Sequence, residues 1–580
     1  MSPIALAAYE SLQQHVTTLL LQVETESHIL PAHLMWAIHA SIIQISCTLR
    51  RNHNASQPLF RLPVEVLHQI VEFSIPMKPS TYPLLLKSSI RDSCSVLPLS
   101  HTCHQLRAMI LSHRLLWRDV NGDKLSITRL LDRNANGLPL RVRSLFSNHT
   151  PGTLSAITSP LQELHLAEIH DPHLQDVNTL LSYPHPALRS LSLGFVSSPR
   201  WRKTRKNLCL SPAHFPELRR LSLLVAPFQI VGTFEWLTHL ALYDITRDDL
   251  HAGVVEFITQ CPSLLHLALG GPLGVQQPAE LPSTVGIAVP AIQQVTLHGF
   301  DAATVQFYVT LLSHADGPSF HVIGFSGNDT SFTSSFLFPA DAPDVTRLSF
   351  ALHPDREGRF CQYEHSLSLT TAGPALTRRL ATYGGSLYLR GLPSWMWHSH
   401  CIDPALAPGF NTIREVWFEN TQSSYPWSRS GMPPYASTHT LFPPSVEEVV
   451  LVVDRSLLPF ETPSLHVLPR ADDRTFACPR LKIVRIAHGH PRDAHPPSPA
   501  VTALDFGPMF RDLASGAYRY LERLVLQTTP LVQVADVDLA RLREHFVSVQ
   551  HERVAELPRM EIRGGESAEW RCESWPGALW

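Results

Sequence analysis

The sequence has no strong charge of either sign and none of the common catalytic motifs. Its 580 residues hold 47 Lys and Arg against 50 Asp and Glu, so no overall field draws the chain to nucleic acid or to an anionic membrane. No P-loop, GxSxG, HExxH or GxGxxG pattern occurs. We therefore expect no catalytic residues, no cofactor and no nucleic-acid partner.

The nine cysteines are scattered and include no CxxC pair. Their odd number and wide spacing favour a reducing compartment over a disulfide framework. The N-terminus MSPIALAAYE lacks the basic region of a secretory signal, and Glu10 falls where its apolar core would run. These features predict a cytoplasmic or nuclear protein.

One apolar run, Ile29–Leu49, contains no Asp, Glu, Lys or Arg and is long enough to cross a membrane. It is interrupted by Pro31, by several histidines and by Gln44. Its apolar residues also recur at alternating steps of three and four, which is typical of a helix with one apolar seam. The seam consists of Met35, Ile38, Ile42, Ile45 and Leu49. We predict amphipathic helices over residues 1–55 and no membrane span.

The stretch Leu62–Trp117 has two amphipathic helical patterns. The first, LPVEVLHQIVEF, places Pro63 where a helix would start and Glu65 near the positive end of the helix. Its apolar stripe is Leu62, Val66, Leu67, Ile70 and Phe73, and the second pattern carries Leu99, Cys103, Leu106, Met109 and Ile110 before Leu116 and Trp117. So short a unit has little interior of its own, so we expect a partner protein to complete its apolar surface.

These residues resemble the F-box, the module that attaches substrate receptors to the Skp-type adaptor of a cullin-RING ubiquitin ligase. The resemblance implies a Skp-type adaptor as partner and, through it, a cullin. The implied adaptor-binding residues are Leu62, Pro63, Val66, Leu67, Ile70, Cys103, Leu116 and Trp117. The chain departs from the family at Leu106, where a Trp is usual, and in the long connection Ile75–Val96.

Beyond this unit, a hexapeptide pattern of three aliphatic or aromatic residues, ΦxxΦxΦ, recurs along the chain. Successive starts through Val345 are separated by 27, 30, 19, 27, 28, 28 and 25 residues, and later steps are larger. The starts are Leu161, Leu188, Leu218, Leu237, Leu264, Ile292, Phe320, Val345, Ile413, Val446, Leu481 and Leu521. Near-regular spacing of this length is typical of stacked repeats.

Each period predicts a strand, a turn, a helix and a return. After Leu237, for example, Val254, Val255 and Ile258 lie on one helical face before CPSL leads to the next strand. A single unit cannot bury both its strand and its helix, whereas stacked parallel neighbours can. LPLRVRSL, residues 138–145, is the expected entry strand.

This organisation resembles the leucine-rich repeat, in the variant often joined to an F-box, although the usual Asn or Cys after the third aliphatic residue is missing. We therefore expect an α/β chain in which an N-terminal helical F-box-like unit precedes an irregular leucine-rich-repeat solenoid. The expected parts are residues 1–55, N-terminal helices; 56–120, the F-box-like domain; 121–540, the solenoid; and 541–580, a C-terminal cap or tail.

Two polar segments invite other interpretations. His488, His490, Asp493 and His495 could bind a transition metal, but their spacing matches no known site, and the neighbouring Gly and Pro residues favour a solvated loop. The basic run Arg202–Lys206 could be a nuclear import signal, although an exposed insertion between repeats is favoured. We expect no metal site.

Two main functional hypotheses follow. In the first, the chain is the target-recognition subunit of an SCF-type ubiquitin ligase, in which the F-box-like helices bind the adaptor and the repeats bind an unknown target protein. In the second, the repeats form an interaction scaffold without a ubiquitin role, and Leu62–Trp117 caps the first repeat. A metal-dependent enzyme using the His488 segment is a third hypothesis. The first two differ in adaptor binding, and metal analysis would test the third.

Overall fold

The computed structural model divides the chain into two compact units. The first consists of Met1–Lys78 and Ile90–Leu138, and the second of Pro79–Ser89 and Pro139–Trp580. The structure describes residues 3–26, 31–74, 97–121, 137–145, 159–170, 173–195, 208–224, 228–243, 248–271, 290–312, 318–323, 330–339, 345–354, 365–373, 377–383, 407–419, 442–454, 463, 465, 468–471, 478–489 and 502–560.

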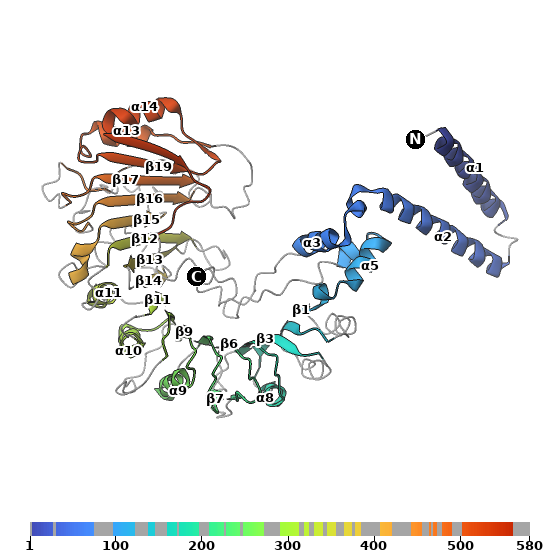
Figure 1. Ribbon diagram of the computed structural model, residues 1–580, viewed down its shortest axis with the longest axis horizontal. Coiled ribbons are helices and arrows are strands. Elements are labelled where there is room, and N and C mark those ends of the chain that lie inside the picture. Colours follow the sequence, from blue (N-terminus) through green and yellow to red (C-terminus); the bar gives the residue numbers. More distant parts are fainter. Residues whose placement is uncertain are drawn as a thin grey trace. The chain divides into compact units, whose positions relative to one another are not determined.

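The first unit is helical (Figure 1). Its elements are α1 (Pro3–Glu26), α2 (Ala32–Ser56), the 3-10 turn η1 (Pro58–Arg61), α3 (Val64–Ser74), α4 (Leu97–Ser100), α5 (His104–Ser112), the 3-10 turn η3 (Arg114–Trp117) and the short strand β1 (Asp119–Asn121). The helices predicted over residues 1–55 are therefore present as α1 and α2.

Helix α2 matches the charge-free apolar run of the sequence. Its stretch Ala32–Arg50 is 19 residues long and, by length and composition, apolar enough to cross a membrane; none of it is buried in the structure. The seam residues Ile42, Ile45 and Leu49 are exposed. The absence of a membrane span stays a prediction.

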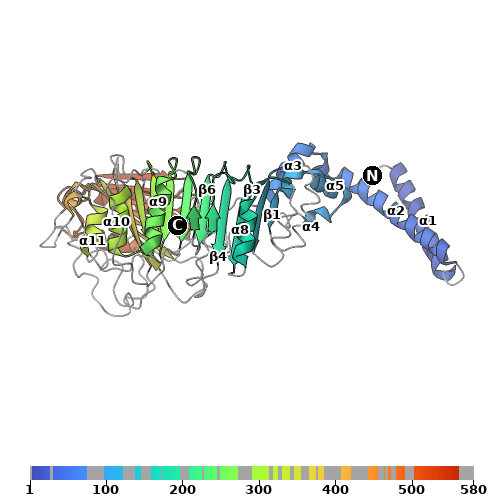
Figure 2. The ribbon, with the colours of Figure 1, turned by 90° about the horizontal axis from the view of Figure 1, so that it is seen from below.

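The second unit is a mixed α/β structure built on one large sheet (Figure 2). Its strands are β2 (Leu140–Leu145), β3 (Leu161–Ile169), β4 (Ser190–Phe195), β6 (Arg220–Leu224), β8 (His239–Tyr243), β9 (His266–Gly270), β10 (Gln294–His298), β11 (Ser319–Ile323), β12 (Arg347–Pro354), β13 (His365–Ala372), β14 (Thr377–Tyr383), β15 (Glu415–Glu419), β16 (Glu448–Asp454), β17 (Ile483–Gly489), β19 (Arg523–Thr528) and β21 (Ser548–Arg553). Two small pairs, β5 (Leu208–Leu210) with β7 (Phe228–Ile230) and β18 (Thr502–Ala503) with β20 (Val532–Gln533), lie outside it.

The strands predicted from all twelve hexapeptides are confirmed, as is the entry strand at β2. From β2 through β11, each of these strands pairs in parallel with the one before it. From β3 through β10 the register keeps the central apolar residue of each hexapeptide in one row, so that Leu221, Leu240 and Leu267 are direct partners and fully buried. One row of leucines therefore runs across many strands.

The helices of the second unit are α8 (Leu174–Ser182), α9 (Asp248–Thr259), α10 (Ala302–Leu312), α11 (Thr330–Leu337), α13 (Gly507–Ala514) and α14 (Asp536–His545). Helices α8 to α11 cover the same face of the sheet (Figures 1 and 2). The predicted helical faces are buried there, as Val177 and Leu181 of α8 and Val254 and Ile258 of α9 show. The core therefore lies between this face and its helices.

The regular pairing is interrupted in the middle of the sheet. β14 pairs in parallel with β11, but β13 pairs antiparallel with both β14 and β12. β15 then pairs in parallel with β12, and the parallel order continues to β21. The sequence predicts β12 but not β13 or β14, because neither carries the hexapeptide pattern.

The prediction of a solvated loop beginning at His488 is wrong for its first two residues. His488 and Gly489 belong to β17, where His488 is fully buried and pairs with Val453 and Thr528. A Cβ at Gly489 would lie 2.3 Å from Oγ1 of Thr529, so only glycine allows this approach. His490, Asp493 and His495 lie outside the described residues, as does the basic run at 202–206.

Candidate functional site

The candidate site is the helix α3 with the turns that flank it. Pro63 precedes the helix, and its carbonyl oxygen accepts hydrogen bonds from the backbone N–H groups of Val66 and Leu67, both at 3.1 Å. Proline fits here because the first turn of a helix needs no donor from it. Glu65 lies in this first turn, near the positive end of the helix dipole. The LPVE sequence thus sets where α3 begins.

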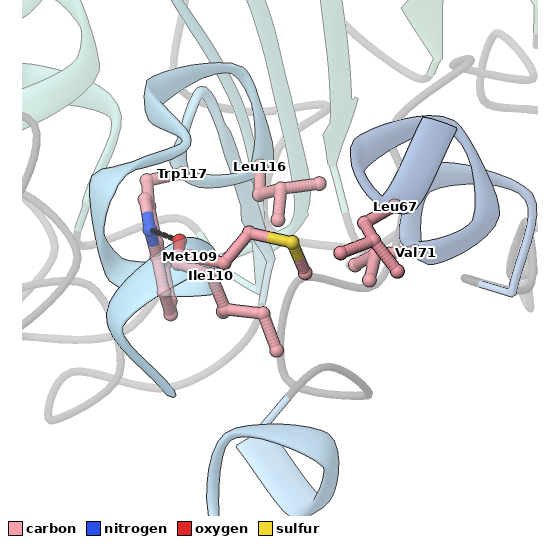
Figure 3. Packing of buried hydrophobic residues seen from close by; sticks show 6 residues of the cluster. All are labelled: Leu67, Val71, Met109, Ile110, Leu116 and Trp117. Atoms are coloured by element: carbon pink, nitrogen blue, oxygen red, sulfur yellow. Dashed lines mark hydrogen bonds between the residues drawn. The ribbon is translucent and has the colours of Figure 1, made fainter. Parts of the chain in front are cut away.

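One face of α3 is buried in a small core. Leu67 and Val71 pack with Met109 and Ile110 of α5 and with Leu116 and Trp117 of η3 (Figure 3). Phe60, Leu99, Leu106 and Leu111 pack at the edge of this cluster. Leu106, which stands in place of an expected Trp, therefore packs at the edge of this core.

A second face of α3 is apolar and exposed. We name it the α3 stripe; it consists of Leu62, Val66, Ile70 and Phe73, which are 38, 37, 42 and 84% exposed. Val66, Ile70 and Phe73 are spaced four and three apart within α3, so at 100° per residue they share one side of the helix, whereas Leu62 lies in extended backbone just before it. The side of Leu67 and Val71 lies about 120° around the axis. Within the described part of the first unit, nothing covers the α3 stripe.

Helix α3 is also joined by polar contacts to His113, the residue between α5 and η3. Nε2 of His113 lies 2.8 Å from Oε1 of Glu72, which links the last turn of α3 to the start of η3. The His113 ring stacks on His68 at a centroid distance of 4.1 Å. Burial lowers the pKa of His68, and the neighbouring His113 lowers it further. These contacts join α3 to the segment between α5 and η3.

Cys103 has a local structural role. Its side chain caps α5, because its Sγ accepts a hydrogen bond from the backbone N–H of Leu106 at 3.4 Å. The residue is half-buried. A thiol is a weak acceptor, so this cap contributes less than a Ser or Asp would.

The structure thus divides the eight predicted adaptor-binding residues. Leu62, Val66 and Ile70 lie on the exposed α3 stripe, and Pro63 lies exposed at its start. The other side chains face the interior or its edge: Leu67, Leu116 and Trp117 are buried, and Cys103 is half-buried. Phe73, the most exposed of the stripe, was in the predicted apolar pattern but not among the predicted contacts. Its position about one helical turn beyond Ile70 was the sequence signal that could have added it to the predicted contacts.

On the sheet of the second unit, polar side chains of neighbouring strands interact with one another. His239 stacks on His266 at 4.3 Å, and Nδ1 of His266 lies 2.7 Å from Oε1 of Gln294. Burial, His266 and Arg220 together lower the pKa of His239 to about 3. Arg189 pairs with Glu217 at 3.2 Å, and both are exposed.

Chemically, the described residues offer no cluster of three or more His, Cys, Asp or Glu side chains that could hold a metal ion. In the comparisons with known proteins, no family model matches the chain and no curated protein matches it.

Proposed function

We propose that the chain is the target-recognition subunit of an SCF-type ubiquitin ligase. In this proposal, the α3 stripe binds a Skp-type adaptor, which connects the chain to a cullin, and the second unit binds a target protein. The protein is not an enzyme itself. It brings a target lysine close to a charged ubiquitin-conjugating enzyme and thereby raises the effective concentration of the reacting groups.

The observation that carries the proposal is the α3 stripe. Three exposed apolar side chains share one side of a short helix, Leu62 lies exposed just before it, and a different side of the helix is already packed. An apolar stripe at these spacings is what a helix presents to a hydrophobic groove of a partner. It lies in the segment whose LPxE start, Cys-capped second helix and final Leu-Trp match the F-box pattern.

Features of the second unit support the part of the proposal in which it binds a target protein. We propose that it is an irregular leucine-rich-repeat solenoid, with β13 and β14 as an insertion that breaks the repeat. The parallel in-register strands, the continuous row that includes Leu221 and Leu240, and the helices on one face are the features expected of stacked repeats. Such arrays bind proteins through the exposed strand face and loops. The proposal places the protein in the cytoplasm or nucleus.

The proposal is tested by co-purifying a tagged full chain with the adaptor from cells. Val66→Glu places a charge in the α3 stripe and should abolish recovery of the adaptor and of the cullin. Val64→Glu is the matched control, because Val64 is also an exposed valine in the first turn of α3 but lies outside the stripe. It should recover both partners as the wild type does.

Ubiquitination of co-purified proteins should fall with Val66→Glu and persist with Val64→Glu. A wild-type chain that recovers target proteins but neither adaptor nor cullin would contradict the receptor function. That result would favour the scaffold alternative, in which α3 belongs to a cap.

A further inference from the structure

The strands β15, β16 and β17 have apolar side chains on both faces. Val449 and Leu451 of β16 point to one face, and Val450 and Val452, which alternate with them, point to the other. All four are buried. On this second face, Trp417 of β15 and Ala487 of β17 lie beside them and are buried as well. A sheet face left to solvent would be polar, so this one is built to be covered.

Part of the cover comes from the chain itself. After β21 the backbone bends at Ala555 and Glu556, and residues 557–560 continue without secondary structure. We name these four residues the strap. Met560 is buried in one apolar cluster, and Leu557 packs against that cluster. The other members of the cluster are Ala372, Trp417, Val450, Val452 and Ala487.

The strap returns over several strands. β21 is bonded to β19, and β19 separates it from β17. Met560 nevertheless belongs to a buried cluster whose other members lie on β13, β15, β16 and β17. A segment that only finished the sheet would stay beside its last strand. This one crosses a face on which the sheet offers an apolar surface to an extended peptide.

The strap is suited to an extended conformation. Pro558 has its φ fixed near the extended range, and a residue before proline, here Leu557, is held to extended backbone. The two apolar side chains of the strap are then three residues apart, at Leu557 and Met560. Little conformational freedom is lost when such a segment lies on a sheet.

The charged side chains around this face favour a basic residue in the segment that covers it. Glu419, at the end of β15, accepts a hydrogen bond from Oγ of Ser349 at 3.2 Å. Burial raises its pKa, while the positive charges of Arg379 and of Arg559 in the strap oppose that rise. Arg559 therefore contributes a favourable charge beside a half-buried carboxyl group. A basic residue between the two apolar anchors suits the face.

We propose that this sheet face is a binding site for an extended peptide of the form apolar-x-basic-apolar, and that the strap Leu557–Met560 is its internal occupant. A target segment of this chemistry would take the place of the strap. That the occupant is a ligase target rests on the proposed function, whereas the binding itself does not. Because the strap is tethered, its effective concentration is on the order of millimolar, so an external segment binds measurably only when the strap is displaced.

The test uses the full chain and a fluorescent peptide of residues 554–563, VAELPRMEIR. The double variant Leu557→Glu with Met560→Glu should release the strap and bind the peptide at least tenfold more tightly than the wild type, measured by fluorescence anisotropy. Ala555→Glu is the control, because Ala555 is exposed and lies before the strap. It should behave as the wild type does.

A charge test separates a specific site from a sticky surface. Glu419→Gln, added to the double variant, should weaken binding of the peptide severalfold. It should leave unchanged the binding of a peptide in which Gln replaces the residue corresponding to Arg559. The effect of Glu419→Gln should thus depend on the basic residue of the peptide. This dependence is expected only if the peptide binds in the same way as the strap.

A folded double variant that does not bind the peptide would overturn the proposal and make the strap a structural cover. If the charged variant does not fold, Leu557→Ala with Met560→Ala removes both anchors without burying a charge and is read in the same way. The assay contains no adaptor. Peptide binding without adaptor binding would therefore refute only the proposed function, and adaptor binding without peptide binding would refute only this inference.

Discussion

Trp117 and Ile110 are joined by a hydrogen bond in which Nε1 of the indole donates to the backbone carbonyl oxygen of Ile110 at 3.0 Å. Both residues are buried, and Trp117 is 1% exposed (Figure 3). The bond connects η3 to the last turn of α5. It satisfies the one polar atom of the Trp117 side chain inside an apolar cluster.

Replacing Trp117 should therefore destabilise the small core beneath the α3 stripe. We expect Trp117→Ala to cost about 3 to 5 kcal/mol through the cavity it leaves, and Trp117→Phe to cost less because the ring is kept. Hydrogen exchange of the α5 amides would report the loss locally. Leu115→Ala is the control, since Leu115 is exposed in the same turn and its replacement should leave exchange unchanged.

The leucine row of the large sheet gives a second prediction. Leu240 is fully buried between Leu221 and Leu267, so Leu240→Ala should cost about 2 to 5 kcal/mol in urea unfolding. Arg219→Ala, at an exposed position next to β6, should change stability by less than about 0.5 kcal/mol. Equal losses in the two variants would contradict the assignment of this row to the interior.

Two half-buried histidines predict how the stability of the second unit depends on pH. Burial lowers the pKa of His298 to about 4, and the pKa of His239 is lowered to about 3. Both values lie below the ordinary histidine value of 6.5, so between the folded and ordinary values the unfolded chain binds protons that the folded chain does not. Stability is therefore fully present above pH 6.5 and declines as the pH falls toward 3.

Thermal unfolding measured between pH 7 and pH 4 checks this direction. His239→Gln, which cannot take up a proton, should make the melting temperature less dependent on pH in that range. A wild-type melting temperature that rises as the pH falls from 7 to 4 would contradict burial of the neutral imidazoles.

Periodicity predicted much of the fold because each hexapeptide is local. Leu240 and its equivalents must be buried whenever their segment forms a strand, and the structure buries them. The antiparallel strands β13 and β14 depend on pairing between segments that share no pattern, so the sequence did not predict them. Gly489 and the prolines after it suggested a loop. Strand β17 nevertheless continues through Gly489, where the absence of a side chain lets Thr529 approach closely.

For the candidate site, the apolar pattern predicted the helix α3 but not the role of each residue. Val66 and Leu67 are adjacent and both fit the pattern, yet one is exposed and the other buried. The difference arises from α5 and η3, which pack on the side of Leu67. Sequence spacing could not separate the two because the apolar arc of α3 is wide enough for both a buried side and an exposed side. The strap was likewise not predicted, since its contacts are distant in sequence.

The central claim is that the α3 stripe binds a Skp-type adaptor, and a titration of the purified full chain with purified adaptor by isothermal calorimetry tests it most directly. We predict saturable binding by the wild type and by Val64→Glu. Ile70→Glu should weaken it by about 30-fold or more, because a buried apolar anchor of an interface contributes about 2 kcal/mol. A folded wild-type chain that does not bind the adaptor, or an Ile70→Glu chain that binds it as tightly as the wild type, would contradict the account.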